Sequence, residues 1–167
     1  MAGGDRGEEE ACPSRGKDLY LTYRLRGHGW AEATISQDGP GVTLTASYLS
    51  DALGDLTAAV VALLGGAEEQ MVCWEEEPGE YRWYFTRAGA QVRVRIAWVP
   101  DNEPGRMRPR EEEVFVASCA LARLAAQVRG ALRQLLAEHG AAGYLAGWIR
   151  YPFPMADFQR LVEATRG

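Results

Sequence analysis

The segment QVRVRIAWV, residues 91–99, is the clearest β-strand in this sequence and fixes the type of fold. Its apolar positions alternate with polar ones and are occupied by Val92, Val94, Ile96 and Trp98. Successive side chains of a strand point to opposite faces, so this alternation predicts a packed face and a water-facing one. Arg93 and Arg95 belong to the water-facing side. A sheet with one packed and one solvated face is typically antiparallel.

Other segments repeat this signal on both sides of residues 91–99. Alternation, or runs of branched and aromatic residues between turn residues, predicts strands at 19–26, 30–37, 42–46, 71–74, 81–87 and 111–119. Several connections are hairpin-length turns, such as GHG at 27–29 and DGPG at 38–41. Such short connections imply antiparallel pairing between neighbours in the chain.

Three segments have the spacing of amphipathic helices. The first follows Ser50, which is a good N-cap residue, and ends at Gly65. The longest covers about residues 121–139 and stops at Gly140, and the last covers about residues 155–165. The sequence therefore predicts an α+β fold. It has an antiparallel sheet of about seven strands in the order βββα-ββββα, helices packed on one face, and a C-terminal helical extension.

Length and composition favour one ordinary domain. The chain has 167 residues, of which 47% are hydrophobic, and we expect residues 19–167 to form a single α+β domain. Residues 1–18 are polar, charged and contain glycine, which predicts a disordered tail. We see no secretory signal and no apolar run as long as a membrane span, so we expect a cytoplasmic protein. The three cysteines form no C-x-x-C pair, which is typical of reduced thiols.

Residues that commonly carry catalysis or bind metals are sparse. The two histidines are His28, in a Gly-His-Gly turn, and His139, at a predicted helix end. Neither lies in a known nucleophile–base pattern, and no His or Cys pair has the spacing of metal ligands. No glycine-rich phosphate motif is present. We therefore predict a protein that is not an enzyme and that has neither a cofactor nor a metal.

The water-facing side of the predicted sheet carries arginine and tyrosine. Its members are Tyr20, Arg24, Arg26, Arg82, Tyr84, Arg93 and Arg95. Some folds stack RNA bases on such a surface, but the net charge of −5 argues against a nucleic-acid partner. A protein partner could use the same face, because arginine and tyrosine are enriched at interfaces.

An acidic hairpin is the second surface feature. The stretch EEEPGE at 75–80 places Glu75, Glu76, Glu77 and Glu80 around one turn, and Glu111–Glu113 form a second cluster. One interpretation is a charged edge that keeps strands from pairing with neighbouring molecules. The other is electrostatic complementarity to a basic partner, which raises the association rate and specificity.

Four stretches resemble small bacterial proteins of the WapI-like immunity group. They are ASYLSDALGDL (46–56), EEEPGEYRW (75–83), VRVRIAW (92–98) and YPFP (151–154). The resemblance implies an immunity protein that neutralises a cognate toxin by protein–protein contact. Toxins that cleave nucleic acid are usually basic, which suits an acidic inhibitor. We predict a partner-binding surface made of Glu75, Glu76, Glu77, Glu80, Arg82, Tyr84, Arg93 and Arg95. A nucleic-acid-binding regulator and a structural interaction domain remain the alternatives.

Overall fold

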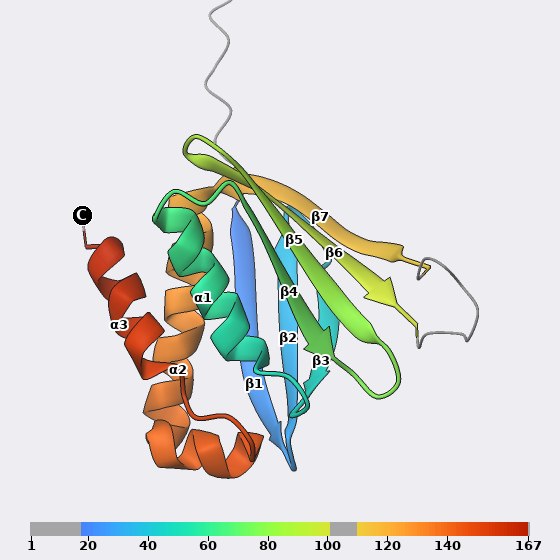
Figure 1. Ribbon diagram of the computed structural model, residues 1–167, viewed down its shortest axis with the longest axis vertical. Helices are drawn as coiled ribbons and strands as arrows, with labels where there is room; N and C mark the ends of the chain where they lie inside the picture. Colours follow the sequence, from blue (N-terminus) through green and yellow to red (C-terminus); the bar gives the residue numbers. More distant parts are fainter. Residues whose placement is uncertain (1–17, 101–109, 167) are drawn as a thin grey trace, which may run out of the picture.

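The computed structural model of the protein describes residues 18–100 and 110–166 (Figure 1). The predicted tail, apart from Asp18, and most of the predicted loop at 100–110 lie outside the described residues. The elements follow the predicted order. They are β1 (Leu19–Gly27), β2 (Trp30–Gln37), β3 (Val42–Ser47), α1 (Ala52–Leu64), β4 (Glu69–Glu75), β5 (Glu80–Ala88), β6 (Gln91–Val99), β7 (Glu112–Ala120), α2 (Leu121–Trp148) and α3 (Met155–Ala164).

The strands form two antiparallel sheets, where the sequence predicted one. The three-stranded sheet has the order β1-β2-β3 and the four-stranded sheet the order β4-β5-β6-β7. The α+β class, the seven antiparallel strands and the C-terminal helix are confirmed. The division falls between β3 and β4, because α1 links these strands and no tight turn forces them into a ladder.

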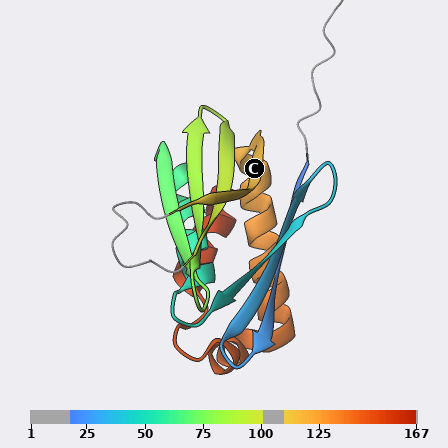
Figure 2. The same cartoon turned by 90° about the vertical axis from the view of Figure 1, so that its right-hand side faces the viewer.

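The inner faces of both sheets share one hydrophobic core with the helices (Figure 2). Tyr23 of the three-stranded sheet packs edge-on against Trp74 of the four-stranded sheet, with ring centroids 5.8 Å apart. Trp83 continues the contact, its ring centroid 4.7 Å from that of Trp74. Aromatic pairs at these distances add to the stability that comes from burying their area. The core therefore holds the two sheets together without a ladder between them.

Helix α2 runs along β1 (Figure 1) and protects the edge of the three-stranded sheet. Leu21 donates its backbone N–H to Gln127 Oε1 at 3.0 Å. Arg123 Nε donates to the carbonyl oxygen of Leu19 at 2.9 Å. Two side chains of the helix thus satisfy backbone groups that an open edge strand would present to other molecules.

The ends of the helices differ from the prediction in two places. Asp51, and not Ser50, caps α1: its carboxylate accepts from the N–H of Gly54 at 3.2 Å. Ser50 Oγ instead accepts from the N–H of Glu75 at 3.0 Å and joins the two halves of the chain. In α2 the predicted stop at Gly140 is a break with φ 65° and ψ 170°, after which the chain becomes helical again and buries Trp148.

No helix in the described part of the chain is both long and apolar enough to cross a membrane.

Candidate functional site

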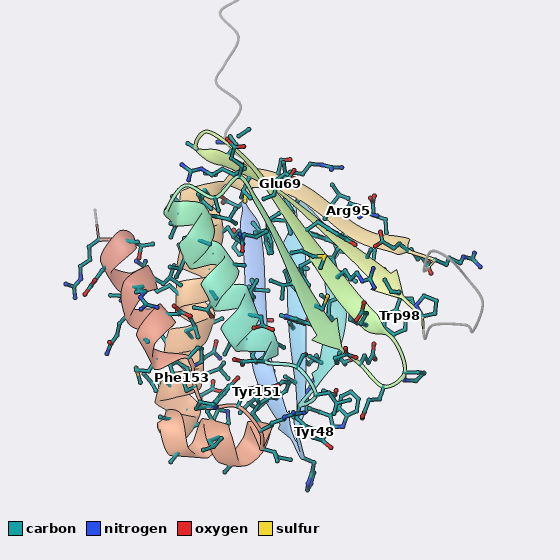
Figure 3. All side chains as sticks on the ribbon, in the orientation of Figure 1. Tyr48, Glu69, Arg95, Trp98, Tyr151 and Phe153 are labelled. Carbon is teal, nitrogen blue, oxygen red and sulfur yellow. The ribbon has the colours of Figure 1, made fainter. Side chains whose placement is uncertain are left out.

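The register of the four-stranded sheet determines which predicted site residues meet. Tyr84 on β5 lies opposite Met71 on β4 and Arg95 on β6. Thr86 lies opposite Glu69 on one side and Arg93 on the other. The side chains of these residues alternate with buried ones and face away from the core, as Figure 3 shows for Arg95. We call this surface the outer face of the four-stranded sheet.

Glu111, which immediately precedes β7, is the centre of a charge network on this face. The hydroxyl of Tyr84 donates a hydrogen bond to its Oε1. Arg95 Nη2 donates to its Oε2 at 3.1 Å, and Arg82 Nη1 lies 3.5 Å from its Oε1. The hydrogen bond from Tyr84 holds the pKa of Glu111 below its usual value; burial opposes this shift, and both guanidinium groups support it.

Both arginines of this network have a second carboxylate. Arg82 Nε donates to Glu80 Oε1 at 2.5 Å, and Arg95 Nε donates to Glu113 Oε2 at 3.0 Å. The Arg95 guanidinium also lies over the ring of Tyr84, 5.0 Å from its centroid. Charge-assisted bonds at two edges of a guanidinium restrict its rotamer. Arg82, Tyr84 and Arg95 are therefore fixed parts of the sheet surface.

The glutamates of the acidic hairpin between β4 and β5 differ in their contacts. Glu76 accepts from Thr45 Oγ1 at 2.5 Å and ties the hairpin to the three-stranded sheet. Glu80 is paired with Arg82. Burial raises the pKa of Glu75, and the carboxylates of Glu80 and Glu77 raise it further. Glu77 is exposed, and among the described residues Glu75, Glu76 and Glu77 form no ion pair, so these three carboxylates carry the uncompensated charge of the hairpin.

Arg93 behaves differently from the other two predicted arginines. Its side chain is exposed on β6, and within the described ranges it has no ion pair or hydrogen-bond partner. On β4, Glu69 is likewise exposed and unpaired in the part of the chain that the structure describes. The outer face thus has two halves. Around Glu111 the charged side chains pair with one another, whereas beside Thr86 the charged groups of Glu69 and Arg93 have no partner among the described residues. We call the half around Thr86 the uncommitted half.

Two residues of the charge network, Glu111 and Glu113, were not among the residues predicted for the partner-binding surface. The sequence showed Glu111 and Glu113 as part of an acidic cluster, but the strand order that brings them to Arg82 and Arg95 was unknown. The predicted arginine and tyrosine surface is also split between the sheets. Tyr20, Arg24 and Arg26 lie on the three-stranded sheet, so they do not join the others in one base-stacking platform.

The described residues offer little that points to chemistry at this surface. No group of three or more His, Cys, Asp or Glu side chains among them is placed to hold a metal ion. The thiols of Cys73 and Cys119 are free, and burial raises the pKa of both. A thiol with a raised pKa is a poor nucleophile, because the thiolate is the reactive form.

Neither protein-family models nor curated proteins give a match to this chain. The resemblance to the WapI-like immunity group stays a prediction.

Proposed function

We propose that this chain is a non-catalytic binding protein that recognises a basic protein partner. Its contact surface is the outer face of the four-stranded sheet together with the β4–β5 hairpin. One observation carries the proposal: among the residues that the structure describes, carboxylates outnumber guanidinium groups on this surface. The acidic members are Glu69, Glu75, Glu76, Glu77, Glu80, Glu111 and Glu113, and the basic members are Arg82, Arg93 and Arg95.

The stiffness of the surface supports this function. Beneath it, Trp83, Phe85, Val94 and Ile96 are at most 1% exposed, so the sheet rests on a packed core. On the surface, the network around Glu111 fixes the arginine rotamers. A surface that is ordered before binding loses less conformational entropy on association. The partner would meet a preformed template of charges.

The charge of the chain agrees with a basic partner. The net charge is −5, and Glu75 and Glu77, which have no ion-pair partner among the described residues, lie on the hairpin beside the face. Complementary charges at the rim of an interface act mainly on the association rate and are screened by salt. We infer an interaction whose association rate falls as ionic strength rises.

The specific form of the proposal is an immunity role in the bacterial cytoplasm. The partner would be a toxin domain with a basic substrate-binding surface, as a domain that acts on nucleic acid requires. The free thiols of the partly buried Cys73 and the buried Cys119 suit a reducing compartment. Under this proposal the protein blocks the toxin by occupying its surface and needs no catalytic group of its own.

A matched pair of double variants tests the proposal against a partner purified by capture on this chain. Glu75→Gln with Glu77→Gln removes two charges but leaves the Thr45–Glu76 and Arg82–Glu80 contacts intact. Glu138→Gln with Glu163→Gln makes the same change of charge on α2 and α3.

We expect the hairpin variant to weaken binding by about five- to tenfold, mostly through the association rate, as two exposed charge pairs predict. The helix variant should bind like the wild type. Equal losses in both variants, or no loss in either, would exclude the hairpin as part of the interface.

A further inference from the structure

A hollow of about 290 Å³ lies on the uncommitted half of the outer face. Its lining comes from two adjacent strands and consists of Glu69, Gln70, Met71, Tyr84, Phe85 and Thr86. Figure 3 shows Glu69 where β4 begins, at one end of the sheet. The hollow is separate from the acidic hairpin, since Glu75 lies six residues further along β4, or about 20 Å at the rise of an extended strand.

The floor of the hollow is apolar and accessible. Met71 is 57% exposed, the largest exposed fraction among the large hydrophobic residues of the described chain. Tyr84 lies directly opposite it, with its hydroxyl held by Glu111 and one ring face covered by Arg95. A flexible thioether beside a fixed aromatic ring can pack closely against an aliphatic chain. This floor suits an unbranched side chain that lies across it.

The only charge among the described residues that line the hollow is the carboxylate of Glu69. The other carboxylates near Tyr84, those of Glu111 and Glu113, are already paired with arginine. Glu69 has no such partner among the described residues, so a cation placed at this end would gain a charge pair without breaking one.

We propose that the hollow is the anchor site for one arginine or lysine side chain of the basic partner. The stem of that side chain packs on Met71 and Tyr84, and its cation pairs with Glu69. Long basic side chains commonly bury their methylene stems on apolar surface while the charged group stays near water. The inference rests on the proposed function, because it names the contact point on the same surface.

The alternative occupants fit less well. An acidic side chain of a partner would face Glu69 across the hollow, and like charges in contact repel. A second copy of the chain would bring together two molecules that each carry a net charge of −5. A neutral apolar side chain would fill the floor but leave the carboxylate unused. Each of these occupants gives a distinct result in the test below.

Methionine-methyl NMR on the full chain tests the proposal without the natural partner. The probes are three capped tripeptides, Gly-Arg-Gly, Gly-citrulline-Gly and Gly-Glu-Gly, in which citrulline keeps the shape of arginine but lacks its charge. The Met71→Leu variant assigns the Met71 signal, and the methyl of Met155, which is 36% exposed on α3, serves as an internal reference.

We expect the arginine peptide to shift the Met71 methyl in a saturable way and to leave the Met155 methyl in place. Glu69→Gln should weaken that binding about two- to fivefold, the range for one exposed ion pair, and citrulline should bind correspondingly more weakly. Glu163→Gln on α3, with the same change of charge, should bind like the wild type.

The opposite results would overturn the inference. These are equal binding of arginine and citrulline, preference for the glutamate peptide, equal effects of Glu69→Gln and Glu163→Gln, or no shift of Met71 at all. A Met71 shift that depends on protein concentration without peptide would point to a second copy. Any of these would leave the proposed function standing, since the hairpin variants with the captured partner test that separately.

Discussion

Replacing Asp51 with asparagine should stabilise the protein at neutral pH. The carboxylate of Asp51 caps α1 at a half-buried position, where burial raises its pKa from 3.8 to about 6. The carboxylates of Asp55 on α1 and, more weakly, Asp157 on α3 raise it further, and the hydrogen bond from Gly54 opposes them. Asparagine removes the charge but keeps a side-chain oxygen that can accept from the N–H of Gly54.

The direction in which the stability changes with pH follows from the raised pKa of Asp51. A carboxyl group with a raised pKa binds its proton more tightly in the folded state than in the unfolded chain. The stability of the wild type should therefore fall as the pH rises from 3.8 to about 6, and the whole penalty is present at neutral pH. Asp51 also interacts electrostatically with the hydroxyls of Tyr23 on β1 and Tyr144 on α2: burial raises the pKa of both tyrosines, and the charge of Asp51 raises it further.

The expected gain is about 1 kcal/mol. The rise of the Asp51 pKa from 3.8 to about 6 corresponds to a loss of folding stability of about 3 kcal/mol as an upper limit. Solvent at the open side of the carboxylate screens part of this, and the substitution also loses a favourable interaction of about 0.3–1 kcal/mol with the helix dipole. The two effects leave a net stabilisation on the order of 1 kcal/mol at neutral pH.

Urea denaturation at about pH 5 and about pH 7.5 measures the effect, through midpoints compared at constant slope. Asp38→Asn is the matched control. It makes the same change of charge in an exposed turn, at φ 54°, a backbone conformation that asparagine adopts readily. The reasoning fails if Asp51→Asn is no more stable than the wild type at the higher pH. It also fails if the wild type and Asp51→Asn lose stability equally between the two pH values.

Three further outcomes can be measured. Glu111→Gln should cost about 1 kcal/mol at neutral pH, because it weakens the bonds from Tyr84 and two arginines. The difference in urea midpoint should shrink as the pH falls below 4.5, because the carboxylate is protonated first in the unfolded chain and, with its lowered pKa, at a still lower pH in the folded protein. Gly79→Ala should cost about 2–3 kcal/mol, because φ is +91° and the new Cβ would lie 2.6 Å from Trp98. The matched Gly89→Ala, at φ +60° with no atom within 4 Å, should cost only about 1 kcal/mol, as thermal unfolding will show. In a filter-binding titration the protein should show no salt-dependent affinity for RNA or DNA, and a steep salt slope would support the alternative.

The candidate site was only partly readable from the sequence. The hairpin at 75–80 and the alternation of Arg93 and Arg95 are local patterns, and both were placed on the correct strands. The partner of each charge was not predictable. Glu111 follows Arg95 by sixteen residues, and only the pairing of β6 with β7 brings their charged groups to 3.1 Å. Met71 read as part of an apolar strand, and its exposure depends on which face of β4 the core covers.

The local features could be derived from the sequence alone: the strands, the helices, their order and, where apolar and polar residues alternate, the side of a strand that avoids water. These follow from periodicities of two and of about 3.6 residues, which depend only on near neighbours in the chain. The separation into two sheets, the link from Thr45 to Glu76 and the pairing of Glu111 with the two arginines became visible in the three-dimensional structure alone. These are contacts between distant segments, and their formation depends on how the shared core packs.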